Sequence, residues 1–224
     1  TFLTDSVAQQ NSTSGSVVDL TSSVNKVHFS NSAQITACRL GDAAACSGTA
    51  TMTAITQESR INWIRGGDVA TGGTNCTDGA ASSCTTWRNW AHADVQHSKP
   101  AVVTYQITPS VTQYMYYVQN NGLLTVVDTA TGKEKWSFLA EEALPQIQAM
   151  MTDAQGPQLQ IADGTASIYV QDFNGDGNIT GSDKVWLLLC SRASSDILAV
   201  SHARRERPAL RHVAYFSFEG RWAH

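Results

Sequence analysis

One twelve-residue stretch, Asp172–Asp183, combines residue types and spacing that suit metal chemistry. Counted from its first residue, oxygen-bearing side chains stand at positions 1, 3 and 5, where the residues are Asp172, Asn174 and Asp176. Gly177 stands at position 6, where such a loop must turn sharply. Calcium prefers about six to eight hard oxygen ligands, and this spacing wraps oxygens around one point. The stretch therefore predicts a calcium-binding loop.

The second half of the loop completes the predicted ligand set. Asn178 at position 7 offers its backbone carbonyl, Thr180 at position 9 can act directly or through water, and Ile179 between them is an apolar anchor. Position 12 is Asp183 rather than Glu, which shortens its reach and predicts weak affinity, roughly 10⁻⁴ to 10⁻³ M. The alternative is an ordinary Asp/Asn/Gly turn without metal. We predict calcium as the cofactor, held by Asp172, Asn174, Asp176, Asn178, Thr180 and Asp183.

No catalytic motif accompanies this loop. The chain contains no Gly-x-Ser-x-Gly, His-Glu-x-x-His, Walker or Gly-x-Gly-x-x-Gly pattern. Asp94 and His97 could form an acid–base pair, but a structural histidine near a turn is the commoner case. We therefore expect a protein that acts by binding and is not an enzyme.

Two predicted strands position the loop. Ser167–Val170 precedes it and Lys184–Leu189 follows it, and both are rich in β-branched, aromatic and leucine residues. The loop is therefore expected to cap a β-hairpin, unlike a paired EF-hand, whose loop joins two helices.

Short apolar runs separated by turn residues predict the rest of the fold. Asn120-Asn121-Gly122 is a strong hairpin turn signal, and Thr131-Gly132-Lys133 predicts a second turn. One short helix is expected in Ala140–Asp153, where Leu144, Ile147, Met150 and Met151 recur at helical spacing. This pattern favours an all-β class: a sandwich, barrel or propeller. The further predicted strands are Val27–Phe29, Ile35–Ala37, Ile61–Ile64, Ala101–Ile107, Tyr114–Val118, Leu123–Val127 and Glu134–Leu139.

Cysteine spacing favours an exported protein. Cys38 and Cys46 are eight residues apart, as are Cys76 and Cys84, and both intervening stretches are rich in small residues. Two local disulfides are the favoured interpretation; four free thiols in a reducing compartment are the alternative. Any export signal is expected upstream, because Thr1–Gly15 has neither a basic start nor an apolar core.

Charge and hydropathy exclude two classes of partner. The formal net charge is −4, which gives no reason to expect nucleic acid. The chain has no run of about 18 apolar residues, so no membrane-spanning helix is predicted.

The segment Asn121–Phe138 resembles the blade signature of quinoprotein-like β-propellers, in which a strand ends in Asp, turns through Thr-Gly and returns with Trp. Asp128 can accept backbone hydrogen bonds in the turn, and Gly132 can adopt a positive φ. The resemblance implies that Trp136 packs between adjacent blades. The chain shows one good copy of this signature.

The order of motifs across roughly residues 55–188 is similar to the C-terminal β-propeller domain of PilC/PilY-type proteins, which are tip-associated adhesins and biogenesis factors of bacterial type IV pili. The similar segments are Ile61–Gly66, Asp94–Val103, Tyr117–Leu124 and the calcium loop. The chain departs from the family at Ala93, where Gly is expected, at Asn121, where Asp is usual, and at Thr180, often a carboxylate.

The resemblance implies a calcium-binding surface protein that acts in pilus biogenesis, retraction control and adhesion. Its expected partners are minor pilins and host or abiotic surfaces, and its expected location is the cell surface, at the pilus tip or outer membrane. One alternative is a fragment of a quinone-dependent periplasmic dehydrogenase, although no vicinal cysteine pair is present. Another is a propeller scaffold for outer-membrane assembly, which has no evident need for a calcium loop.

The chain divides into three parts by composition. Residues 1–25 form a polar lead-in that we expect to be poorly ordered, and residues 26–190 form a partial propeller of about three blades with exposed strand edges. Residues 191–224 hold six of the ten Arg and three of the six His residues but no Lys. This tail reflects either a reading frame lost near residue 188 or a basic partner-binding segment. Cys190 is expected to be an unpaired thiol.

Overall fold

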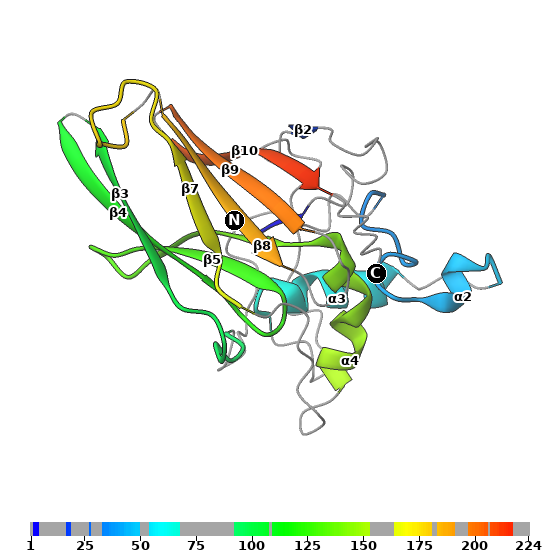
Figure 1. Ribbon diagram of the computed structural model, residues 1–224. Coiled ribbons are helices and arrows are strands. Elements are labelled where there is room, and N and C mark those ends of the chain that lie inside the picture. Colours follow the sequence, from blue (N-terminus) through cyan, green and yellow to red (C-terminus); the bar gives the residue numbers. More distant parts are fainter. Residues whose placement is uncertain are drawn as a thin grey trace, which may run out of the picture.

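The computed structural model is mostly β, with two sheets and a small group of helices (Figure 1). It describes residues 2–4, 17–18, 27, 33–49, 54–67, 92–107, 109–152, 164–180, 183–190, 197–205 and 207–216. Within those ranges, no helix is long and apolar enough to cross a membrane. The prediction of a β-rich chain is confirmed, but the all-β class is too narrow because helices cover part of the first sheet.

The first sheet is built from four consecutive antiparallel strands. They are β3 (Ala101–Ile107), β4 (Ser110–Val118), β5 (Leu123–Asp128) and β6 (Glu134–Leu139). A short strand near the N-terminus, β1 (Phe2–Thr4), pairs in parallel with β6. All four long strands were predicted, and the bounds of β3 and β6 agree with the prediction.

The second sheet repeats the antiparallel arrangement. It contains β7 (Ser167–Gln171), β8 (Lys184–Cys190), β9 (Ile197–Arg205) and β10 (Arg207–Phe216), and β2 (Val17–Val18) pairs antiparallel with β10. The predicted strands on either side of the acidic loop are confirmed as β7 and β8. Strands β9 and β10 lie in the part of the chain whose composition differs, and their backbones extend this sheet beyond β8.

Both predicted turns of the first sheet are confirmed. Gly122 between β4 and β5 has φ 88°, and Gly132 between β5 and β6 has φ 66°. In the second turn, Asp128 Oδ1 accepts the backbone N–H of Ala130 at 3.0 Å, and its Oδ2 lies 2.9 Å from Lys135 Nζ. The hydrogen bond from Lys135 is the main cause that lowers the pKa of Asp128 below its ordinary value.

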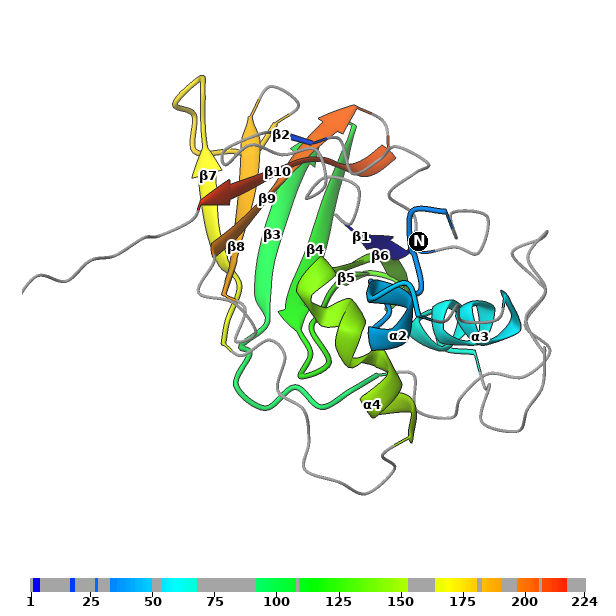
Figure 2. The same cartoon turned by 90° about the vertical axis from the view of Figure 1, so that its right-hand side faces the viewer.

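The main core lies between the two sheets. From the first sheet, Tyr116, Trp136 and Phe138 are buried, and from the second, Val185 and Leu187 have no exposed surface. These residues belong to one apolar cluster, which explains why the two sheets stand side by side in Figure 2. Alternation along each strand sends these side chains to a shared inner face. Trp136 thus packs between two sheets.

This core contains a hydrogen bond between two buried tyrosine side chains, Tyr105 and Tyr116. The hydroxyl groups of Tyr105 and Tyr116 lie 2.8 Å apart, so one donates to the other. Burial raises the pKa of both hydroxyl groups above the ordinary value of 10.0. Tyr114 completes an aromatic group, with its ring centroid 5.6 Å from that of Tyr105.

Helices cover part of the opposite face of the first sheet. They are α2 (Ala43–Cys46), α3 (Ala54–Ile64), the 3-10 helix η3 (Glu141–Gln146) and α4 (Ile147–Thr152). A second apolar cluster joins them to β5 and β6, and Figure 2 shows α2, α3 and α4 gathered together. The predicted helix in Ala140–Asp153 is present, although it divides into two; Pro145, which lacks a backbone N–H, lies in the 3-10 part.

The predicted strand at Ile61–Ile64 is wrong, because these residues form the last turn of α3. Gln57, Arg60, Ile61 and Ile64 follow helical spacing, and the last three are buried. Gly66, with φ 94°, ends the helix by donating its N–H to the carbonyl of Trp63. The N–H of Gly67 donates to the carbonyl of Asn62, so Gly66 and Gly67 together cap the helix.

The predicted strand at Ile35–Ala37 is also wrong, because the chain turns there. The N–H of Leu40 donates to the carbonyl of Thr36, while the side chain of Ile35 is fully buried in the second apolar cluster. Of the predicted strand Val27–Phe29, only Val27 lies within the described residues, and it is buried.

Candidate metal site in the loop between β7 and β8

The acidic loop connects strands β7 and β8, which form a hairpin and pack against the main core. The two strands pair in antiparallel register from Ser167 opposite Leu188 to Gln171 opposite Lys184, so the loop starts and ends at adjacent positions. Figure 1 shows the loop in yellow beyond the end of β7, next to the tip of the β3–β4 hairpin. Residues 181 and 182 of the loop lie outside the described residues.

Asp172 organises the first half of the loop. Its Oδ1 accepts the backbone N–H groups of Asn174 at 3.2 Å and Gly175 at 2.7 Å, and its Oδ2 accepts that of Gly177 at 2.8 Å. Gly175 and Gly177 have φ values of 70° and 75°, a conformation that other residues rarely adopt. The carboxylate at position 1 and the Gly at position 6 therefore build the turn that the sequence pattern predicts.

Asn174 and Asp176 form the outer wall of the same turn. The N–H of Asp176 donates to Asn174 Oδ1 at 3.1 Å, and Asn174 Nδ2 donates to Asp176 Oδ2 at 3.0 Å. The N–H of Asn178 donates to Asp176 Oδ1 at 2.7 Å. Asn174 and Asp176 are exposed, so solvent and ions reach them.

Asp183 closes the loop from the buried side. It is 4% exposed; its Oδ1 accepts the N–H of Phe173 at 3.0 Å, and its Oδ2 accepts both the N–H and the hydroxyl of Thr180 at 2.7 Å. A carboxylate has about four lone-pair positions, so these three donors leave at most one for another partner. Hydrogen bonds therefore occupy most of the Asp183 carboxylate in this arrangement, in agreement with the short reach of Asp at position 12.

The loop suits calcium in its donors and in its turn geometry. The six predicted residues supply three carboxylates together with amide, carbonyl and hydroxyl oxygens, which are the hard donors that calcium prefers. Within the described residues, no three His, Cys, Asp or Glu side chains are gathered into a ready-made metal-binding group. The carboxylates instead hold backbone N–H groups, and metal binding would use their remaining lone pairs.

A buried polar network on the first sheet has no counterpart in the sequence prediction. Gln119 Nε2 donates to Thr125 Oγ1 at 2.7 Å and lies 3.2 Å from His92 Nδ1, and Thr125 Oγ1 lies 3.2 Å from Ser137 Oγ. These groups line a cavity of about 30 Å³, which has room for one water molecule. The only sequence signal for this network was a polar residue in each of two apolar strands, Thr125 in β5 and Ser137 in β6.

The other predicted site features have mixed outcomes. The disulfide between Cys38 and Cys46 is confirmed. Cys76 and Cys84 lie outside the described residues. Asp94 and His97 are exposed, and the carbonyl of Asp94 accepts the N–H of Asn120, which fixes this segment against the β4–β5 hairpin.

A comparison of the chain with known protein families, curated proteins and solved structures found no match.

Proposed function

We propose that this chain is a calcium-binding module of a bacterial cell-surface protein of the type IV pilus system. Calcium is held by the loop residues Asp172, Asn174, Asp176, Asn178, Thr180 and Asp183. The protein acts by binding rather than by catalysis, in pilus biogenesis, retraction control and adhesion. Its partners are minor pilins and host or abiotic surfaces.

The hydrogen bonding of Asp172 is the observation that carries the calcium proposal. Its carboxylate gathers three backbone N–H groups and bends the loop through two glycines with positive φ. Next to this turn, the side chains of Asn174 and Asp176 bond to each other in an exposed part of the loop.

We also propose that residues 26–190 belong to a partial β-propeller of about three blades. The first sheet contains four consecutive antiparallel strands, and it packs against the second sheet around Trp136. Propeller blades are commonly sheets of four strands arranged in this way. The blade resemblance of Asn121–Phe138 supports the same arrangement, because that segment forms β5, its turn and β6.

Calcium should stabilise the chain by mass action. If the affinity lies in the expected weak range, 10 mM calcium raises the free energy of unfolding by about 1.4 to 2.7 kcal/mol. Thermal or urea unfolding with and without calcium measures this gain, and magnesium at equal ionic strength is the control. Asp172→Ala and Asp176→Ala should abolish the gain, and an equal gain in these variants would contradict the assignment of the loop.

The pilus assignment needs a separate measurement. Purified minor pilins are passed over the immobilised chain with calcium and then with a chelator. We expect binding that depends on calcium and is lost in Asp176→Ala. Calcium binding without any pilin binding would retain the metal site and reject these partners.

A further inference from the structure

The acidic loop belongs to the second sheet, but one of its residues pairs with the first sheet. Ile179 forms an isolated parallel bridge with Tyr105 on β3. The backbone N–H of Gln106 donates to the carbonyl oxygen of Ile179 at 2.8 Å. Strand β3 is the outermost strand of its sheet, as β7 is of the other sheet. The loop therefore ties together two sheets by using the edge of β3.

The side chain of Ile179 strengthens this tie. It is partly buried and packs against the inter-sheet cluster, which includes Val103 and Tyr105 from the first sheet and Val185 from the second. Ile179 thus contacts both the edge and the interior of the sheet interface. Its backbone cannot move without disturbing an apolar contact and a hydrogen bond together.

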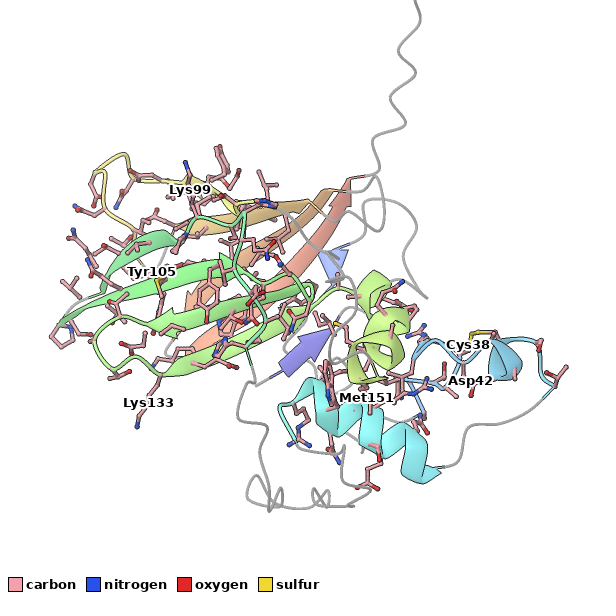
Figure 3. The ribbon with its side chains drawn as sticks, turned by 90° about the horizontal axis from the view of Figure 1, so that it is seen from below. Cys38, Asp42, Lys99, Tyr105, Lys133 and Met151 are labelled. Atoms are coloured by element: carbon pink, nitrogen blue, oxygen red, sulfur yellow. A yellow bond between two sulfur atoms is a disulfide. The ribbon has the colours of Figure 1, made fainter. Side chains whose placement is uncertain are left out.

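Away from the Ile179 contact, the edge strands β3 and β7 of the two sheets are separated by a groove. At the other end of the two strands, the N–H of Lys99 donates to Thr165 Oγ1 at 2.9 Å. Figure 3 shows Lys99 beside the second sheet and Tyr105 within the first. Between the two ties lies a groove of about 290 Å³, lined by residues of both edges, including Val102, Thr104, Ile168 and Val170. The two edge strands are therefore not closely packed along the groove, so the contacts at its two ends, Lys99 with Thr165 and Gln106 with Ile179, hold the edges together.

The position of Ile179 in the loop joins this tie to the metal site. Its two neighbours, Asn178 and Thr180, are both predicted calcium ligands. The N–H of Asn178 is held by Asp176, and the N–H of Thr180 is held by Asp183. Any change in the loop carboxylates therefore reaches Ile179 through one peptide unit on either side.

We propose that Ile179 is a strap through which calcium in the loop controls the contact between the two sheets. This inference rests on the proposed calcium function. Calcium fixes the backbone on both sides of Ile179, which holds its carbonyl on the N–H of Gln106. Without calcium the strap opens more often, and the edge of β3 and the adjoining groove become accessible.

Hydrogen exchange of the Gln106 amide measures the strap directly. We expect calcium to slow this exchange by about five- to tenfold, at the lower end of coupling between sites in proteins. The amide of Asp128 is the internal control, because it donates to Lys133 in a turn of the same sheet far along the chain from the loop. Its exchange should slow less than that of Gln106, since it reports general stabilisation only.

Two apolar truncations in the same loop form a matched pair. Ile179→Ala removes the side chain that packs on the core, whereas Phe173→Ala removes a ring that is 56% exposed. Because coupling is reciprocal, Ile179→Ala should weaken calcium affinity by about the same five- to tenfold factor and remove the calcium effect on Gln106. Phe173→Ala should leave both properties near wild type.

The outcomes separate this inference from the function on which it rests. Calcium binding by calorimetry with no change at Gln106 would overturn the strap and leave the metal site intact. Absence of calcium binding in the folded chain would reject both. Equal effects of the Ile179 and Phe173 truncations on calcium affinity and on Gln106 exchange would also overturn the strap.

Discussion

Asp183 differs from the other carboxylates of the acidic loop because it is buried. It accepts hydrogen bonds from Phe173 and Thr180, whereas Asp176 is exposed and bonds within the turn. A buried acceptor whose loss leaves donors unpaired stabilises the fold itself. The two residues should therefore be separable in the metal-free protein: Asp183 closes the loop there, whereas Asp176 acts only as a calcium ligand.

Substitutions at these two positions test the separation. In the metal-free protein, Asp183→Ala should lower the free energy of unfolding by about 1–3 kcal/mol, since it leaves the Phe173 and Thr180 donors without their carboxylate. Asp176→Ala should change it by less than about 0.5 kcal/mol, as is usual at exposed positions. Urea unfolding in a chelator measures both, and equal losses would contradict the closing role of Asp183.

The buried tyrosine pair predicts sensitivity to alkali. An unfolded tyrosine ionises near pH 10, whereas burial raises the pKa of Tyr105 and Tyr116 above that value. Their stabilisation is therefore complete below pH 10 and is lost as the pH rises further. The free energy of unfolding should fall by up to about 1.4 kcal/mol per pH unit for each tyrosine.

A pair of variants checks this origin. Tyr116→Phe should reduce the alkaline slope and cost about 1 kcal/mol at pH 8, because it removes the hydrogen bond with Tyr105. Tyr169→Phe, at a position 58% exposed, should change neither quantity. An unchanged alkaline slope in Tyr116→Phe would show that other groups govern the transition.

At the scale of elements, the loop closed by the Cys38–Cys46 disulfide (the disulfide loop) packs closely against helices α3 and η3. Gly41 has φ 85°, and a β-carbon there would collide with the carbonyl oxygen of Pro145 in η3. Arg60 in α3 donates to the carbonyl of Leu40 at 2.6 Å, and Arg39 pairs with Glu141 at 3.2 Å. Figure 3 shows Cys38 and its disulfide at the opposite side of the molecule from Lys133.

Substitutions at two glycines distinguish the cost of a steric collision from the cost of backbone strain. Gly48 also has a positive φ, 70°, but a β-carbon there would meet nothing within 4 Å. Gly48→Ala should therefore cost about 1 kcal/mol, the strain of the left-handed conformation alone. Gly41→Ala should cost at least about twice that, because backbone must also move. Similar losses in urea unfolding would show that the disulfide loop is not fixed against η3.

The elements show what a sequence can and cannot predict here. Strands β3 to β8 were predicted because their apolar runs are bounded by strong turn residues such as Asn121-Gly122 and Thr131-Gly132. Helix α3 was missed because Ile61–Ile64 is a short, mostly apolar run that resembles a strand, while its helical spacing begins at Gln57. In short apolar runs, periodicity alone does not separate the two structures.

In the candidate site, too, the local features could be predicted from the sequence and the long-range contact could not. The turn around Asp172 follows from local spacing, because its donors lie within five residues of the carboxylate. The bond from Gln106 to Ile179 joins residues far apart in the chain, and nothing in the local pattern of either segment requires it. Long-range pairings of this kind depend on how the two sheets pack.

At the scale of the whole molecule, two sheets share one core, and one loop reaches from the second sheet to the first. The sheets share Trp136 and its neighbours, and the loop ties their edges through Ile179. In the proposed propeller, calcium would act at a junction between consecutive blades. The loop is thus placed to affect the arrangement of the two sheets as well as its own conformation.

Calcium titration by calorimetry on the full chain tests the central claim most directly. We predict one binding event per chain with a dissociation constant of roughly 10⁻⁴ to 10⁻³ M, absent in Asp172→Ala and Asp176→Ala. Circular dichroism before the titration establishes that each sample is folded. No heat of binding in folded wild-type protein at millimolar calcium, or unchanged binding in both variants, would contradict the assignment of the loop as a metal site.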